Sequence, residues 1–179
     1  MIFMETNPNI AVRVEPIIGI ADLGQSDIDV AICWGSGEWS DIERDLQFKC
    51  PARPTANVAV AARVRAIGLE RALVEIPLLA DSSGSTGWRE WHRRAGLDYR
   101  PMHNRLVIPD SHDRVQAVID GQGIALWDAL LQNELDSGAL CYLSEVALDD
   151  AGYYLAYTAP AAERSAVVAT FVDWIRHHV

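Results

Sequence analysis

Residues 105–127 read RLVIPDSHDRVQAVIDGQGIALW, and the order of apolar and polar residues in this stretch decides the fold class. RLVIPD predicts a short strand, and Val115, Val118 and Ile119 then recur at helical spacing until Gly121. GIALW at 123–127 predicts a second, buried strand. A strand, a helix and another strand within so short a distance indicate an α/β architecture.

The same alternation of strands and helices extends over the rest of the chain. Strands are predicted for IAVRVEPIIGI at 10–20, DIDVAICW at 27–34, ERDLQFKC at 43–50, NVAVAA at 57–62, CYLSEVAL at 141–148 and GYYLAYTAP at 152–160. Helices are predicted from Ser85 or Thr86 to Gly96, in WDALLQNELDSGAL at 127–140, and from Pro160 onward. DIDVAICW has the continuous apolar run of a buried parallel strand, so we expect mainly parallel sheets.

Length and composition predict a fully folded chain. It has 179 residues, of which 50% are hydrophobic and 22% charged, and it carries a formal charge of −10. This length fits one domain or two small lobes. Basic residues never cluster beyond Arg93-Arg94, and phosphate binding depends on clustered cations. We therefore expect no direct nucleic-acid contact by this chain.

The cysteines and the N-terminus predict a cytoplasmic protein. Cys33, Cys50 and Cys141 are odd in number and far apart, so they predict neither a disulfide framework nor a metal knuckle, and a reducing compartment fits them best. The apolar start MIFM is too short for a signal peptide. Because no apolar run approaches twenty residues, we expect no membrane span.

The cluster Asp110-Ser111-His112 contains the residue types of a nucleophilic triad. A triad, however, is assembled from separate elements, whereas these three residues are adjacent. The chain also has no G-x-S-x-G elbow, and GSTG at 84–87 has the wrong spacing. Helix capping by Asp110 or Ser111, which stabilises by about 1 kcal/mol, is the simpler interpretation. We predict no catalytic residue, and a serine hydrolase remains a remote alternative.

Three junctions that follow predicted strands carry small hydroxyl residues. They are Trp34-Gly35-Ser36, Ser82-Ser83 and the cluster at 110–112. Free amides and the positive end of a helix dipole meet polar ligands at such junctions, so the three together suggest a polar cleft. Trp34 or Trp39 is the better candidate for a cleft aromatic, because Trp88 and Trp91 fit the buried face of a helix.

Neither a metal nor a cofactor is expected. His177-His178 lacks a carboxylate or cysteine partner at a suitable spacing, so a solvated helix end is the better interpretation. Gly121-Gln122-Gly123 lacks the third glycine of a dinucleotide fingerprint and follows a helix instead of a strand. The two glycines fit a left-handed helix cap and a close entry into the next strand.

Six segments, taken in order, resemble the effector-binding domain of LysR-type transcriptional regulators, with the glycine-cleavage-activator-like subgroup as the nearest type. The segments are DIDVAICWGSGEW, PLLADSS with GWREWHRRAGL, DSHDRVQAVIDGQGIAL, NELDSGAL, GYYLAY and FVDWIRHH. The resemblance extends over residues 8 to 178. The resemblance implies a two-lobed α/β fold like that of the periplasmic binding proteins, with a small-molecule cleft between the lobes.

The resemblance also implies the lobe boundaries and the ligand contacts. Lobe I would comprise residues 1–52 plus 160–179, and lobe II residues 53–159. Ligand-binding residues would be Trp34, Gly35 and Ser36 in lobe I, with Ser82, Ser83, Ser111 and His112 in lobe II. Tyr153 falls in the crossing segment GYYLAY, where an aromatic often lines the cleft.

The pattern departs from the family at the N-terminus. The winged helix-turn-helix and the first strand of lobe I find no match in the sequence. We therefore expect a non-enzymatic effector-binding domain, stand-alone or truncated, that forms a homodimer through lobe I to cover an exposed sheet edge. The alternative is an interaction protein that pairs with a full-length regulator and modulates it without binding an effector.

Overall fold

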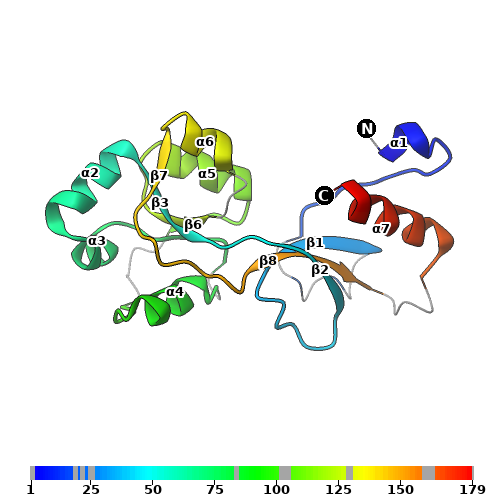
Figure 1. Cartoon of the computed structure of the whole chain (residues 1–179), viewed down its shortest axis with the longest axis horizontal. Helices are drawn as coiled ribbons and strands as arrows, with labels where there is room; N and C mark the ends of the chain where they lie inside the picture. Colours follow the sequence, from blue (N-terminus) through cyan, green and yellow to red (C-terminus); the bar gives the residue numbers. More distant parts are fainter. Residues whose placement is uncertain are drawn as a thin grey trace. The chain divides into compact units, whose positions relative to one another are not determined.

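A computed structural model describes residues 3–17, 20, 23, 27–82, 85–100, 106–127, 131–158 and 164–178 (Figure 1). The chain divides into two compact units. Unit 1 comprises Met1–Lys49 and Asp150–Val179, and unit 2 comprises Cys50–Asp149. The chain therefore crosses from one unit to the other twice.

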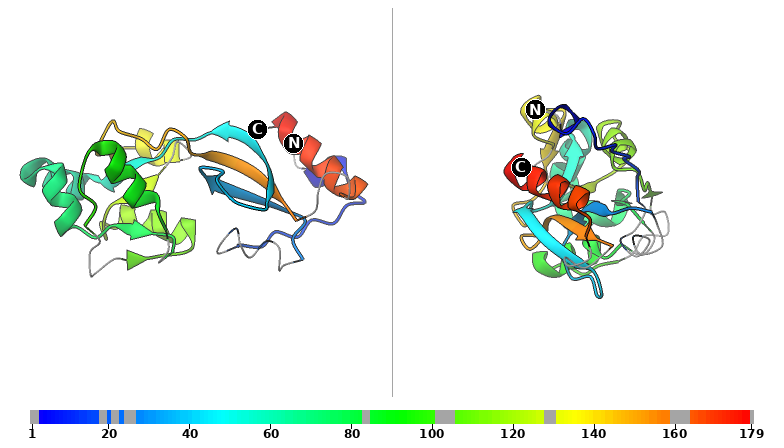
Figure 2. Two further views of the ribbon diagram at one scale, coloured as in Figure 1. Left: turned by 90° about the horizontal axis from the view of Figure 1, so that it is seen from below. Right: turned by 90° about the vertical axis from the view of Figure 1, so that its right-hand side faces the viewer.

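Unit 1 contains a three-stranded antiparallel sheet. Its strands are β1 (Val30–Gly35), β8 (Gly152–Tyr157) and β2 (Glu43–Lys49), and β8 lies between the other two (Figure 2, left). Ile32 pairs with Leu155 and Trp34 with Tyr153, while a bulge interrupts the pairing of β2 between Leu46 and Phe48. The described residues of the unit also form the helices α1 (Phe3–Thr6) and α7 (Ala166–His178).

Apolar side chains cover both faces of this sheet. On one face, Leu155 and Tyr157 pack against the buried side of α7, which presents Val168, Val172 and Ile175. The other face packs Ala31 and Ala156 against Leu23, with Ile17, Ile20 and Ile28 around them. Phe3 of α1 makes edge contacts with Phe171 and Trp174, at ring distances of 5.2 and 5.5 Å. The short first helix is thus anchored to α7.

Unit 2 mixes antiparallel and parallel strand pairs with five helices among its described residues. The strands are β3 (Arg53–Asn57), β4 (Leu79–Ala80), β5 (Leu106–Val107), β6 (Ala125–Trp127) and β7 (Leu140–Tyr142). β3 pairs antiparallel with β6 and β7, and β4 pairs parallel with β5. The helices are α2 (Val58–Ile67), α3 (Leu69–Glu75), α4 (Gly87–Ala95), α5 (Ser111–Ile119) and α6 (Gln132–Asp136).

Helix α4 contributes the two largest buried side chains of unit 2. Trp88 is 2% exposed and Trp91 is 0% exposed. Each indole N–H has a hydrogen-bond acceptor, Leu79 O at 2.8 Å for Trp88 and Val146 O at 2.9 Å for Trp91. The prediction that both tryptophans belong to the core is confirmed. Burial of an indole with its N–H satisfied stabilises without leaving a polar group unpaired.

Local chemistry fixes several helix ends in unit 2. Asn57 caps α2 by accepting a 2.8 Å hydrogen bond from the Val60 N–H, and its side-chain amide donates to Ile119 O at 2.9 Å. Gly96, with φ of 68°, ends α4 as predicted. Gly121 follows α5 with φ of 77°. A Cβ on Gly123 would lie 2.2 Å from Pro77 O, so the close entry into the next strand is confirmed.

Two predicted strands are wrong in the described residues. Residues 10–17 of IAVRVEPIIGI form no strand, and Val14 is 89% exposed. Alternating apolar and polar residues give a segment two faces. They do not supply the neighbouring strand whose hydrogen bonds a β-strand needs. NVAVAA at 57–62 is also no strand beyond Asn57, because Val58 begins α2. The N-cap at Asn57 and the alanines favour the helix.

The expected strand directions and segment bounds also need correction. DIDVAICW does form a strand, but β1 is antiparallel to β8 and lies at a sheet edge. Most described strand pairs are antiparallel, so the expectation of mainly parallel sheets is wrong.

The predicted helix 127–140 is shorter, Gln132–Asp136, and residues 128–130 and Pro160 lie outside the described residues. The second crossing between units falls at Asp149–Asp150 instead of 159–160, because β8 belongs to the sheet of unit 1.

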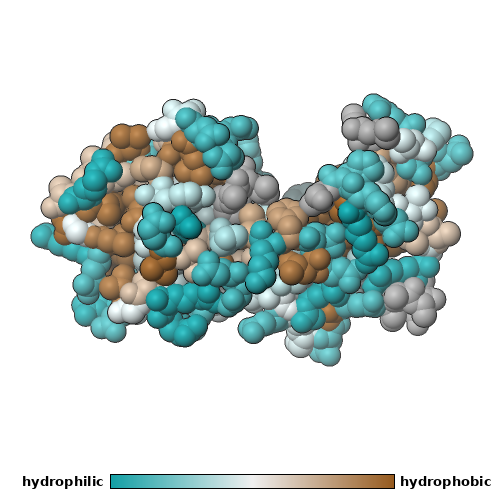
Figure 3. All heavy atoms as spheres, viewed as in Figure 1, coloured by the Kyte–Doolittle hydropathy of each residue, from teal (hydrophilic) through white to brown (hydrophobic). Residues whose placement is uncertain are grey.

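The visible surface is mostly hydrophilic, with apolar residues gathered over α2 and α3 of unit 2 (Figure 3). Val58 and Val74 on these helices are 55% and 45% exposed. Among the described residues, no helix is both long enough and apolar enough to cross a membrane.

Candidate functional site

The candidate residues of unit 2 lie at one edge of the β4–β5 pair. Leu79 pairs with Leu106 and Ala80 with Val107 in parallel, and Ile108 N–H donates to Ala80 O at 2.9 Å. Ser82 therefore follows β4 at the same edge where Ser111 and His112 follow β5. Ser82 is half-buried, while Ser111 and His112 are exposed. Ser83 lies outside the described residues.

Asp110 fixes the start of α5. Its Oδ1 accepts hydrogen bonds from the backbone N–H groups of His112, at 2.8 Å, and Asp113, at 3.0 Å. These bonds from Asp113 and His112 hold the pKa of the Asp110 carboxyl below its usual value. The carboxylate is thus occupied as a helix cap instead of orienting the His112 imidazole. This geometry supports the capping interpretation of the cluster and gives no triad.

Arg114 donates hydrogen bonds to the same turn, a contact that the sequence analysis did not predict. Its Nη1 donates to Ile108 O at 2.5 Å and to Pro109 O at 3.1 Å, the two carbonyls that precede Asp110. The guanidinium lies 4.8 Å from the centre of the Trp127 ring. Burial lowers the pKa of Arg114, and the charges of Asp81 and Asp110 oppose that shift. Only the spacing of Arg114 four residues after Asp110 could have pointed to a contact with this turn.

The candidate residues of unit 1 meet at the end of β1. Trp34 pairs with Tyr153 of β8, and the Tyr153 ring lies 5.3 Å from Phe48 of β2. Paired residues of antiparallel strands share a face, so these aromatics form a row across the sheet. All three are half-buried. Trp39 does not join the row, because its ring packs edge-on against Tyr154, whose side chain points to the opposite face.

The loop after β1 is held closely in place. The Tyr154 hydroxyl donates to Ser36 O at 3.2 Å, and Ser36 Oγ accepts from the Glu38 N–H at 3.4 Å. A Cβ on Gly35 would lie 2.9 Å from the Trp39 ring, so a larger residue would displace that indole. Gly37 has φ of 75° and lies directly against Tyr154. Ser36 itself remains exposed beside the half-buried Gly35 and Trp34.

The structure therefore gathers the predicted residues into two sets. Trp34, Gly35, Ser36 and Tyr153 form the set of unit 1. Ser82, Ser111 and His112 form the set of unit 2. Each set lies where a strand ends, as the three junctions predicted.

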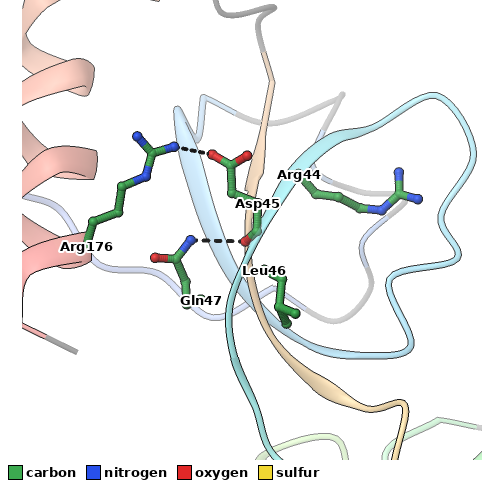
Figure 4. Close-up of a pocket in the computed structure, with 5 residues that line it drawn as sticks. All are labelled: Arg44, Asp45, Leu46, Gln47 and Arg176. Atoms are coloured by element: carbon green, nitrogen blue, oxygen red, sulfur yellow. Dashed lines mark hydrogen bonds and ion pairs between the residues drawn. The ribbon is translucent and has the colours of Figure 1, made fainter.

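Two pockets within the units lie apart from these sets. One, of about 430 Å³, lies beside β2 and is lined by Arg44, Asp45, Leu46, Gln47 and Arg176 (Figure 4). Asp45 Oδ2 accepts from Arg176 at 2.5 Å and from the Tyr157 hydroxyl at 2.7 Å, so the charge of Asp45 is paired with that of Arg176. The other, of about 500 Å³, lies between α3 and the residues after α4, with the buried His92 in its wall.

The histidines of the last helix bond to their own backbone. Nδ1 of His177 lies 2.6 Å from Asp173 O, and Nδ1 of His178 lies 2.8 Å from Trp174 O. The His178 ring also stacks on Trp174 at 4.7 Å. Within the described ranges, no three His, Cys, Asp or Glu residues group closely enough to hold a metal ion.

The chain is similar in sequence to known transcriptional activators. The chain is 27% identical to the glycine cleavage system transcriptional activator of Escherichia coli K12 over 175 residues, which cover 97% of this chain and 57% of the relative. It is 25% identical to the AmpR activator of Citrobacter koseri over 174 residues, covering 97% and 59%. The chain thus spans less than two thirds of the length of these relatives.

Solved effector domains share the fold. The effector domain of AmpR from Pseudomonas aeruginosa superposes with a TM-score of 0.78 at 25% identity, covering 98% of this chain and 84% of that one. CrgA of Neisseria meningitidis, a LysR-type regulator, superposes with a TM-score of 0.74 over 98% of this chain and 60% of its own. At 18% identity, CrgA supports the fold alone. The model of the LysR substrate binding domain matches residues 2–179, and the chain belongs to that family.

Proposed function

We propose that this chain is the non-enzymatic, cytoplasmic effector-binding part of a LysR-type transcriptional regulator. The family match over residues 2–179 carries the proposal. The likeness to the AmpR effector domain supports it, and both curated relatives are named as transcriptional activators. Unit 1 corresponds to lobe I and unit 2 to lobe II in this proposal.

Each residue set offers an effector its own kind of contact. Unit 2 offers the exposed hydroxyl of Ser111 and the exposed imidazole of His112 as hydrogen-bonding groups, because Asp110 already occupies two backbone N–H groups at the start of α5. Unit 1 offers the apolar row Trp34, Tyr153 and Phe48, with the Ser36 hydroxyl beside it. A hydrogen-bonding group of the ligand would suit the set of unit 2, and an apolar group would suit the set of unit 1.

Binding would regulate by shifting the balance between two conformations. A ligand can move that balance only by the difference in its affinity for the two states. The regulators of this family are typically oligomeric, and we include in the proposal a homodimer that forms through unit 1.

Thermal unfolding with a library of amino acids and metabolites tests the proposal. A ligand at one hundred times its dissociation constant should raise the free energy of unfolding by about 2.7 kcal/mol. Titration calorimetry with the best ligand should then show Ser111→Ala weakening binding about tenfold, the equivalent of 1.4 kcal/mol. Ser137→Ala is the matched control, because Ser137 is an exposed serine of unit 2 after α6, outside both residue sets.

Two results would contradict this function. If no compound in the library shifts the unfolding temperature while a full-length regulator co-purifies with the chain, the interaction-protein alternative replaces effector binding. If a ligand binds but Ser111→Ala and Ser137→Ala bind it equally well, effector binding stands and the assigned contacts at α5 are wrong.

A further inference from the structure

The pocket between α3 and the residues after α4 has the size and the lining of a small-molecule site. Its volume is about 500 Å³, within the range of pockets that hold small ligands. All its lining residues belong to unit 2, and Ser82, Ser111 and His112 are not among them. The apolar part of its wall is aliphatic and consists of Ile67, Leu69, Leu73, Val74 and Leu97.

His92 supplies a buried polar group in this wall. It is 4% exposed, and its ring packs edge-on against Trp91 and Tyr99, at 5.4 and 5.1 Å between ring centres. Nδ1 lies 2.7 Å from Trp88 O, and because a carbonyl oxygen only accepts, Nδ1 carries the ring proton. Burial lowers the pKa of His92, which favours the neutral ring, so Nε2 keeps an acceptor lone pair.

Nε2 is left for a ligand. Among the described residues, His92 makes no hydrogen bond besides the one from Nδ1 to Trp88 O. Polar atoms of buried side chains usually have a partner, so an unused acceptor in the wall of a pocket indicates a bound group that donates. The buried part of the wall thus selects a hydrogen-bond donor.

The charged side chains of the lining favour a cation over an anion. Arg71 is paired with Glu75 at 2.6 Å, and Arg100 lies 3.9 Å from Asp98. Glu70 is exposed and forms no ion pair with any residue that the structure describes. The carboxylate of Glu70 is therefore available to a positively charged ligand, whereas the two arginines already have acidic partners.

We propose that this pocket is a second ligand site, separate from the effector contacts, and that it binds a small amine with an apolar body. The aliphatic wall holds the body of the ligand. An N–H of the ammonium group donates to His92 Nε2, and Glu70 attracts its charge. A carboxylate ligand of the same shape would be repelled by Glu70 and would find no donor at Nε2.

Nitrogen NMR of the full chain with isotope-labelled histidine tests the site. The probes are phenethylamine and hydrocinnamate, which share a phenyl ring on two methylene groups and differ in carrying an ammonium or a carboxylate. The amine should bind at least tenfold more tightly than the acid. It should move the Nε2 resonance of His92 and leave that of Nδ1 nearly unchanged, because only Nε2 gains a hydrogen bond.

Two variants separate the roles of the lining residues. His92→Phe keeps the bulk of the ring but removes Nε2, and should weaken amine binding about tenfold. Glu70→Gln changes an exposed side chain, so the fold is retained, and should remove most of the preference for the amine over the acid. Glu134→Gln, on α6 and outside the pocket lining, is the matched control and should leave both affinities unchanged.

The outcomes that overturn the site are specific. They are equal affinity for the two probes, no binding of the amine at millimolar concentration, or amine binding that leaves His92 Nε2 and the Glu70→Gln variant unaffected. Amine binding that is lost in Ser111→Ala but kept in Glu70→Gln would belong to the effector contacts, and would also overturn the second site. Effector binding is judged by Ser111→Ala with its own ligand, so the failure of one site is distinguishable from the failure of the other.

Discussion

The two units reach stability by different routes. Unit 2 surrounds its strands with helices and buries Trp88 and Trp91 completely, each with a satisfied N–H. Unit 1 has one long helix on one face of a small sheet, and Leu23 with Ile17, Ile20 and Ile28 packs on the other face. Its sheet leaves Ile32 61% exposed. The difference indicates that unit 2 is the stable unit, while unit 1 gains most from a binding partner.

The largest expected effect comes from the core of unit 2. Trp91→Ala should lower its free energy of unfolding by about 3–5 kcal/mol, because it leaves a cavity and an unpaired Val146 carbonyl. Hydrogen exchange followed by mass spectrometry should show faster exchange across unit 2 and little change in β1, β2 and β8. Trp91→Phe, which keeps most of the bulk, should cost less. Equal acceleration in both units would show instead that they unfold as one body.

A smaller effect is expected from the link between α2 and α5. Asn57→Ala removes both the N-cap of α2 and the bond to Ile119 O, and should cost about 1–2 kcal/mol in urea denaturation. Asn57→Ser should recover the cap but not the bond to Ile119. If serine restores full stability, the contact between the two helices contributes nothing measurable.

The smallest effect is a difference in the acid response of the two units. Burial lowers the pKa of His92, although its bond to Trp88 O opposes the shift, so its stability contribution is complete above about pH 6.5 and is lost as the pH falls through the folded pKa. Burial alone would raise the pKa of Asp45, but hydrogen bonds from Tyr157 and Arg176 lower it. Its contribution is therefore complete above about pH 4 and is lost below, in the more acidic window.

Unit 2 should thus weaken at a higher pH than unit 1 as acid is added. Hydrogen exchange at a series of pH values would measure each unit separately. His92→Gln should flatten the response of unit 2 between pH 7 and 5, and Asp45→Asn should flatten that of unit 1 below pH 4. Unchanged pH profiles in both variants would assign the acid response to other groups.

The sequence predicted the elements whose signals are local. Capping residues, glycine at a helix end and helical spacing predicted three such features. They are Asp110 at the start of α5, Gly96 at the end of α4 and the apolar face of α7. The direction of each strand could not be predicted, because it depends on which distant segment provides the neighbouring strand. Residues 10–17 alternate as a strand would, yet no neighbour within the described ranges gives them a ladder.

Only part of the candidate site could be predicted from the sequence. Hydroxyl residues after strands located the two sets correctly on the sheet ends, although their role as ligand contacts stays a prediction. The placement of Tyr153 beside Trp34 follows from the register of β1 and β8, which local periodicity does not encode. The contacts of Arg114 depend on the Trp127 ring and on two backbone carbonyls, and the spacing of Arg114 four residues after Asp110 does not specify these partners.

The central position of β8 has a consequence for biosynthesis. β1 and β2 bond to β8 and not to each other, so neither has its ladder until residues 152–157 have left the ribosome. All of unit 2 is synthesised before that point, and domains generally fold as they emerge. Unit 2 is therefore complete while β1, which carries no charged residue, still lacks β8 on the nascent chain. During that interval β1 is a segment that a chaperone can protect from aggregation.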